Sequence, residues 1–353
     1  MLEYRQLANI LSMFLIVQLA GVLLAFYLIS PSVVSVITGG ATATTSPDVL
    51  LYFAYMLVAA VIMVLLFRAH HGVLLFQVIE GIVVVTAAFY LFLIILGSIL
   101  PQDSIYPIPI SLLASIGLIL AKNRWPGLRN FTAIISSIGV GLVMGVYFSF
   151  FAAYILMALI AVYDYVAVFI TKHMIALGRE TVNRNLAFMI GTYDVELVPK
   201  SYLKEKERKE FGKAFSKTKS KTLKRLIKEG NVPLPSFSAL GAGDLAIPLM
   251  LEISAYVTYL SYFMSIVIII GAAFGLVFAM WVSKRYKIAL PAIPPLFAFV
   301  SMALSIFLFF SSLATWQAYL SLLIASIAIL MLMLLTAKRQ SASGSKNRIF
   351  PAQ

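Results

Sequence analysis

The sequence predicts an all-α protein that crosses a membrane many times. Hydrophobic residues occupy 61% of its 353 positions and charged residues only 12%, and the mean hydropathy is +0.98. A water-soluble domain of this length carries roughly twice that share of charge. Because the chain has too little polar surface to cover a core in water, lipid is the solvent that fits this composition.

Ten apolar segments are long enough to span a bilayer, which takes about 20 residues of helix. The first follows Arg5 and runs from Leu7 to about Ile29, beyond the roughly 7–15 apolar residues of a signal peptide, so we expect an uncleaved span. Three longer stretches each hold two spans, divided by turns near Gly145–Ser149, Val257–Ser261 and Ser311–Gln317. The ten predicted spans are residues 7–29, 50–67, 73–100, 105–121, 131–147, 149–170, 239–257, 259–282, 290–310 and 316–335.

Basic residues indicate how these spans are oriented. Fifteen of the 27 Lys and Arg residues lie between Lys172 and Lys228, and the others flank apolar runs. With the amino terminus inside, all 27 fall in cytoplasmic segments, as the positive-inside rule requires. We therefore expect a plasma-membrane protein with both termini in the cytoplasm, and the clustering argues against nucleic acid as a partner.

Four regions follow from this topology. We expect an N-terminal membrane bundle of six spans at 1–171, a basic cytoplasmic loop at 172–237, a C-terminal membrane bundle of four spans at 238–337, and a cytoplasmic tail at 338–353. Residues 200–229 of the loop are strongly basic. This stretch is either an amphipathic element on anionic lipid headgroups or a solvated linker.

Four acidic residues are expected at membrane depth, where an ionisable side chain costs several kcal/mol by most estimates. They are Glu80, Asp164, Asp244 and Glu252. Every basic residue falls at a span end, so we expect no salt bridge to explain them. At 1.5 Å per residue, Asp164 lies about 12 Å below the basic boundary and Asp244 roughly 8–12 Å below it. Since they occupy consecutive antiparallel spans, the two aspartates are expected to face each other.

Two facing carboxyl groups in a low dielectric cannot both ionise, so they share a proton. The ionised member can accept a proton from water while the protonated member donates to a peptide carbonyl. Such hydrolysis needs no cofactor and no metal ion. The chain has no cysteine and only three histidines, so thiol catalysis and a Cys- or His-rich metal site are not expected.

The neighbours of the two acids strengthen this hypothesis. Asp244 ends the run Gly241-Ala242-Gly243-Asp244, in which glycines let another backbone approach closely and loosen the helix. Two spans later comes Pro291-Ala292-Ile293-Pro294-Pro295, whose three prolines are expected to prevent an ordinary helix start. Extended backbone there could pair with an unwound substrate as an added strand.

Taken in order, these motifs resemble the presenilin and signal peptide peptidase family of GxGD-type intramembrane aspartyl proteases. The resemblance rests on Tyr163-Asp164, the GAGD run and the Pro-Ala segment, and Thr171-Lys172-His173-Met174 is similar to archaeal members. It implies a presenilin-like helical bundle, a catalytic pair of Asp164 and Asp244, and site-shaping roles for Tyr163, Gly241, Gly243, Pro291, Ala292 and Ile293. The implied partners are transmembrane peptide substrates.

Two features depart from the family pattern. Ile293 stands where the family has leucine, which is a volume-conserving change that should be tolerated. Family members typically have nine spans, whereas this chain shows a tenth at about Trp316–Leu335. A tenth helix would either brace the ninth span or mediate assembly. In the second case the protein would form a homo-oligomer.

Two other functions compete with this one. Membrane-buried carboxylates also build ion pathways in secondary transporters, although no inverted repeat is visible here. A prepilin-type peptidase also uses a GxGD aspartate, but the Tyr-Asp span and the late Pro-Ala segment argue against it. Glu80 and Glu252 fit either hydrogen-bonded structural roles or functional ones.

Overall fold

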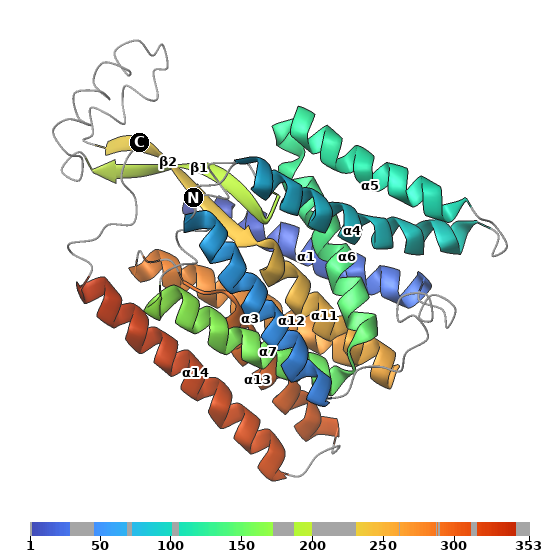
Figure 1. The fold of residues 1–353 in the computed structure, drawn as a ribbon. Coiled ribbons are helices and arrows are strands. Elements are labelled where there is room, and N and C mark those ends of the chain that lie inside the picture. The colour runs from blue at the N-terminus through green and yellow to red at the C-terminus, as the bar shows by residue number, and fades with distance from the viewer. Residues whose placement is uncertain are drawn as a thin grey trace.

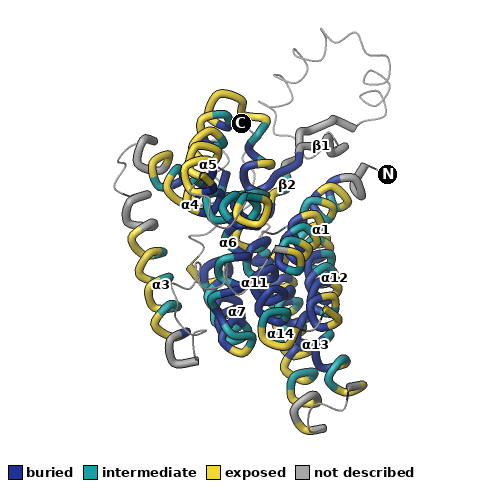
Figure 2. The backbone as a smooth tube through the Cα atoms, turned by 90° about the vertical axis from the view of Figure 1, so that its right-hand side faces the viewer, coloured by how far each residue is buried: buried dark blue, intermediate teal, exposed yellow. Residues whose placement is uncertain are grey.

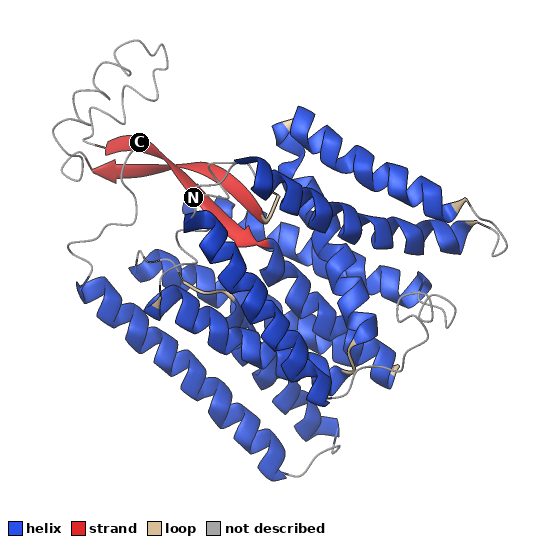
Figure 3. Ribbon diagram, viewed as in Figure 1, coloured by secondary structure: helices blue, strands red, loops and turns tan. Residues whose placement is uncertain are grey.

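The structure is a computed structural model of the chain. It describes residues 2–28, 46–68, 73–100, 106–171, 187–199, 231–260, 262–286, 288, 290–311 and 316–343. Ten α-helices and one two-stranded antiparallel sheet make up this part of the chain (Figures 1 and 3). An α-helix therefore forms at each of the ten predicted spans, and the three turns that divide the longest stretches lie where the sequence predicts them.

The first six α-helices are α1 (Leu2–Leu28), α3 (Ser46–Arg68), α4 (Val73–Ile99), α5 (Pro107–Arg124), α6 (Arg129–Tyr147) and α7 (Phe150–Tyr165). A short 3₁₀ turn, η1 (Pro126–Leu128), joins α5 to α6, and a π-helical turn, η2 (Val166–Ile170), extends α7. The strands are β1 (Met189–Pro199) and β2 (Asn231–Gly241). The remaining helices are α11 (Ala242–Tyr259), α12 (Tyr262–Tyr286), α13 (Ile293–Ser311) and α14 (Trp316–Ser343).

Length and composition let seven of the described helices cross a membrane. Of the other three, α3 is apolar over the shorter described range Val49–Ile62, and α5 and α11 are less apolar because they carry charged residues. Lys122 and Arg124 close α5, while α11 carries Asp244 and Glu252. The chain is an integral membrane protein, and α11 carries these two acidic residues within the helix bundle.

Helix α11 forms the centre of the bundle, packed against α1, α6 and α12. Figure 2 shows it as a largely buried tube, while much of α5 lies exposed at the edge. Leu249 projects from α11 toward Gly21 of α1 and Gly141 of α6, and a Cβ atom at Gly141 would come within 2.7 Å of the Leu249 side chain. Small residues on both neighbours therefore let α11 sit deep between them.

Close backbone contact also joins α12 to α13. A Cβ atom at Gly271 would lie 2.9 Å from Val300 Cα, and one at Gly275 would lie 2.6 Å from Leu296 Cα. Glycines four residues apart share one face of a helix, so α12 presents a flat strip to α13. This contact fixes the position of the first turns of α13.

The antiparallel pair β1–β2, which was not predicted, lies mostly in the segment expected to be a basic loop, and β2 extends past residue 237 into the predicted seventh span. Gly191 pairs with Ala239, and Met189 pairs with Gly241. The basic stretch at 200–229 lies outside the described residues. Because β2 ends at Gly241 and α11 begins at Ala242, the sheet leads directly into the GAGD run.

Candidate active site

Asp164 lies at the carboxyl end of α7, with 7% of its surface exposed. The following turn is the π-helix η2, in which the Thr171 amide donates to the Val166 carbonyl oxygen at 3.0 Å. Asp164 Oδ2 accepts a hydrogen bond of 3.4 Å from the backbone N–H of Ile293. That amide is the first of α13, so the carboxylate caps the positive end of that helix.

Asp244 lies in the first turn of α11. The predicted span began at residue 239, which would place Asp244 five residues inside the helix, but α11 begins at Ala242. Gly241 is instead the last residue of β2, and its N–H donates to Asp244 Oδ2 at 3.2 Å. A Cβ atom at Gly241 would lie 3.1 Å from the same oxygen, so glycine gives this carboxylate room to fold back onto the strand end.

The two aspartates are close enough for the charge of Asp244 to act on the Asp164 carboxyl group. Each is also held by a backbone amide at a helix amino terminus, Asp164 at α13 and Asp244 at α11. Helix amino termini favour negative charge, whereas mutual repulsion opposes ionisation of both groups. Asp244 is only half-buried, so protein does not seal this part of the site.

The Pro-Ala segment lies beside Asp164, as the sequence analysis expected, but its backbone differs from that expectation. Pro291 and Ala292 precede the helix, and α13 begins at Ile293, inside the segment predicted to prevent a helix start. Pro294 and Pro295 occupy the first turn, where amide hydrogens have no partner within the helix and proline is tolerated. The segment presents the Ile293 amide to Asp164 and is buried.

Two other predicted site residues border this pair. Tyr163 precedes Asp164 on α7 and is partly exposed. Gly243 is exposed, and a Cβ atom there would meet no atom within 4 Å. The face of α11 beside Asp244 is therefore open, and Gly243 has no packing partner among the described residues that requires glycine.

Several polar side chains that the sequence analysis did not single out fix the strands beside the site. Asn130 of α6 donates from Nδ2 to the Gly191 carbonyl oxygen at 2.8 Å, and its Oδ1 accepts from the Gly191 amide at 3.0 Å. Ser238 Oγ donates to Gln6 Oε1 of α1 at 3.0 Å. Ser137 Oγ donates to the carbonyl oxygen of Ala242 at 3.2 Å. Helices α1 and α6 thus hold both strands and the start of α11.

Glu80 corrects the expectation that no buried acid has a basic partner. Lys122 Nζ lies 2.6 Å from Glu80 Oε1, and both side chains are almost fully buried. The same oxygen accepts from the backbone N–H of Ala187, two residues before β1. The four-carbon stem of a lysine lets its ammonium group reach inward from a helix end. A basic residue placed at the end of a span can therefore still pair with an acid deeper in the bundle.

Glu252 differs from Glu80. It lies on α11 with 0% of its surface exposed, and neither carboxyl oxygen has a hydrogen-bond partner among the described residues. Its backbone carbonyl accepts from Ser265 Oγ at 2.7 Å. Glu252 lies two turns beyond Asp244 and plays no part in the hydrogen bonds that hold the two aspartates.

Comparison with known proteins shows which structures this fold resembles. Two solved structures, described as a presenilin family intramembrane aspartate protease in the C222 and in the P2 space group, are similar in fold. The first shares 18% sequence identity with a TM-score of 0.55, covering 87% of this chain and 99% of its own. The second shares 19% identity with a TM-score of 0.52, covering 87% of this chain and 97% of its own. No curated protein sequence matches the chain.

A family profile described as "Signal-peptide peptidase, presenilin aspartyl protease" matches residues 11–298. That range includes both aspartates, the GAGD run and the Pro-Ala segment, and it ends before α14 begins. The tenth helix is therefore an addition to the matched region. By this match the chain belongs to the signal peptide peptidase and presenilin family of aspartyl proteases, which makes it an intramembrane-cleaving aspartic endopeptidase.

Proposed function

We propose that Asp164 and Asp244 are the catalytic pair and that they hydrolyse peptide bonds within transmembrane segments of membrane proteins or signal peptides. The observation that carries this proposal is the placement of both carboxyl groups within electrostatic reach, each held by a backbone amide of a different element. With one proton shared between them, one group is a base and the other an acid.

In the first step the ionised carboxylate takes a proton from a water molecule, whose oxygen attacks the peptide carbonyl carbon. The protonated carboxyl group gives its proton to the carbonyl oxygen, which forms a neutral tetrahedral diol. Collapse of the diol breaks the C–N bond as the proton taken from water passes to the leaving amine, and one diol hydroxyl returns its proton to the other carboxylate as the new carboxylic acid forms. The two carboxyl groups end with one proton between them again.

The sheet offers an edge on which a substrate could be extended before this reaction. Asn130 binds both backbone groups of Gly191, so these groups point away from β2. Gly191 and Ala239 form a non-hydrogen-bonded pair, and the corresponding groups of Ala239 point to the opposite edge of the sheet. A substrate strand added beside Ala239 would continue toward Gly241 and Asp244, with its amides no longer hidden in a helix.

The proposed reaction takes place inside the membrane, on substrates that share that environment. Substrates are transmembrane peptides that enter from the lipid, and weakly helical segments are preferred because unwinding them costs less. The enzyme lies in the plasma membrane with both termini in the cytoplasm, and the basic stretch at 200–229 contacts anionic headgroups. Tyr163, Gly243 and Pro291 to Ile293 border the substrate at the aspartates.

Cleavage of a transmembrane peptide by the reconstituted full chain tests the pair. We expect Asp164→Asn and Asp244→Asn each to reduce cleavage by more than about 10³-fold, because either change removes one of the two proton-transfer groups. Glu252→Gln is the matched control, since it makes the same chemical change on α11 without touching the pair. Wild-type turnover in either aspartate variant, with the fold intact, would remove that residue from the mechanism.

The pH dependence of cleavage provides a second test. At low pH both carboxyl groups are protonated and no base is left, whereas at high pH both are ionised and no acid is left. The plot of kcat/KM against pH should therefore be bell-shaped, with two apparent values that belong to the pair. A single-limbed profile over the whole stable pH range would contradict a shared proton.

A further inference from the structure

A pocket of about 290 Å³ lies between the end of α7 and the tenth helix. Its lining residues are Tyr165, Phe169, Ile170, Thr336, Arg339 and Gln340. Half of them belong to α14, which begins after the region matched by the family profile ends. The pocket therefore exists only because this chain carries the additional helix.

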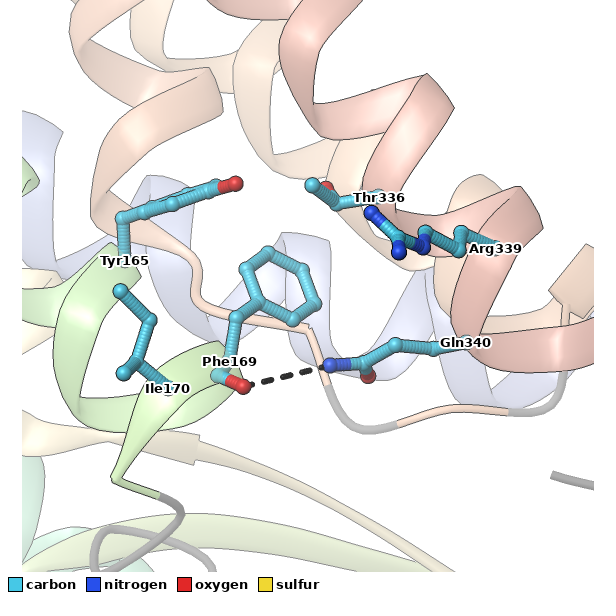
Figure 4. A pocket seen from close by; sticks show the side chains of 6 residues that line it. All are labelled: Tyr165, Phe169, Ile170, Thr336, Arg339 and Gln340. Carbon is cyan, nitrogen blue, oxygen red and sulfur yellow. Dashed lines mark hydrogen bonds between the residues drawn. The ribbon is translucent and has the colours of Figure 1, made fainter. Parts of the chain in front are cut away.

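The two helices touch directly at this pocket. Gln340 Nε2 donates at 3.4 Å to the carbonyl oxygen of Phe169, which belongs to the π-helical turn that follows Asp164 (Figure 4). Val168 and Phe169 also pack against Met333 of α14 in a small apolar cluster. The wall of the pocket is thus continuous with the turn that ends the helix of the first aspartate.

Tyr165 and Arg339 supply the donors that the pocket can offer to a ligand, because the Thr336 hydroxyl already donates to the Leu332 carbonyl oxygen and Gln340 donates to Phe169. In Figure 4 the Tyr165 hydroxyl points toward Thr336 and Arg339. Arg339 is exposed and has no carboxylate partner among the residues that the structure describes. A guanidinium group offers planar paired donors that match the oxygens of a phosphate, and no acid lines the pocket to repel such a group.

The pocket lies at the level of the membrane surface, where a phosphate group of a lipid would be found. Basic residues close α5 and α12 at Lys122, Arg124, Lys284 and Arg285. Arg339 lies near the end of α14, which runs toward the same basic boundary as the end of α7 (Figure 1). Ile170 is 67% exposed at the pocket wall, so an apolar surface adjoins the polar mouth, as a phospholipid requires.

We propose that this pocket is a binding site for a phosphate group, seated on Arg339 between α14 and the π-helical end of α7. The phosphodiester of an anionic phospholipid headgroup and a free phosphate ion share the chemistry that Arg339 recognises. The proposal concerns binding alone and holds whichever residues carry out peptide hydrolysis.

Native mass spectrometry of the full chain can measure this binding. In one arm the protein, held in dodecyl maltoside, which contains no phosphate, is titrated with phosphatidylglycerol, and in the other with inorganic phosphate. Arg339→Gln should weaken binding about tenfold, as expected for loss of a charge-assisted hydrogen bond. The matched control is Lys338→Gln, which removes the same charge from an exposed neighbour outside the pocket lining and should change binding less than about twofold.

The two arms separate the sources of the phosphate. Arg339-dependent binding of phosphatidylglycerol alone identifies a lipid headgroup, and Arg339-dependent binding of inorganic phosphate identifies a free ion. Equal losses in Arg339→Gln and Lys338→Gln would mean diffuse attraction to a basic surface and would overturn the proposal. Unchanged binding in Arg339→Gln would overturn it as well.

Discussion

The inner helices and the peripheral helices of this protein are attached by different means. Half of the span Phe150–Ile170, which carries Asp164, is buried in protein, whereas only 17% of the span Leu320–Ser341 in α14 is buried. Inside, glycines bring backbones together, as where Gly275 meets Leu296. At the periphery, α14 packs along α13, and a single polar bond from Gln340 to Phe169 joins its end to the inner helix α7.

This difference follows from the solvent on each side. Lipid tails are as apolar as leucine, so burying more apolar surface gives little drive for helices to associate, and close packing or hydrogen bonds must supply it. The site needs two carboxyl groups held in fixed positions, and tight steric contact provides that rigidity. The outer helices need only to stay attached, for which a few strong contacts are enough.

The buried ion pair between Glu80 and Lys122 joins the peripheral helices α4 and α5. Its removal is expected to have the largest effect on stability. Glu80→Gln leaves the buried Lys122 ammonium without its counter-charge, which should cost about 3–5 kcal/mol of unfolding free energy. Because Glu80 also holds Ala187 before β1, amide hydrogen exchange in β1 should speed up. Thermal unfolding in detergent measures the first effect.

A compensating variant serves as the control for Glu80. Glu80→Gln combined with Lys122→Met removes both charges and should recover most of the lost stability. If Glu80→Gln alone unfolds at the wild-type temperature, the ion pair does not attach α4 to α5, and the contrast between the two regions is weakened.

The steric attachment of the inner helices can be tested at Gly275. Gly275→Ala places a methyl group 2.6 Å from the backbone of Leu296, so α12 and α13 must separate, at about 1–3 kcal/mol. Cleavage should also fall, since Leu296 lies three residues after the amide that binds Asp164. Gly117→Ala on α5 meets open space, so it should leave cleavage unchanged and should not lower the unfolding free energy, since alanine is the better helix former. Equal losses in the two variants would contradict the steric account.

The smallest expected effect concerns Glu252, whose carboxyl group has no partner among the described residues. Glu252→Leu removes an unpaired buried polar group and should raise the unfolding free energy by about 1–2 kcal/mol. Glu252→Gln, which keeps a polar group, should gain less. A loss of stability in the leucine variant would show that the inner region also depends on a polar contact at this residue.

Apolar runs and basic ends were enough to predict the ten helices, because lipid leaves the backbone few alternatives. The arrangement of Asp164, Asp244 and the Pro-Ala segment was also predictable, since consecutive antiparallel spans meet at one depth. The start of α11 was not. Gly241 belongs to a strand, and glycine in a run of small residues carries no local signal that separates a strand end from a loosened helix.

The strands and the Glu80 pair were missed for a shared reason, which is that both depend on partners distant in sequence. β2 contains Pro233 and Pro235, which argue against a strand in any local reading of the sequence, and its partner β1 ends 32 residues earlier. Lys122 and Glu80 are 42 residues apart. Pairings of this kind become visible only when the helices that carry them are placed beside one another.

The bond from the Ile293 amide to Asp164 has a practical consequence for trapping a substrate. The Asp164 carboxyl group both takes part in the proposed reaction and binds the first amide of α13. Replacing it by alanine would remove both functions. An asparagine side chain still provides an oxygen that accepts a hydrogen bond from the Ile293 amide, whereas an alanine side chain provides no acceptor. An Asp164→Asn chain is therefore the form in which a stalled complex with an intact peptide should keep the architecture of the working enzyme.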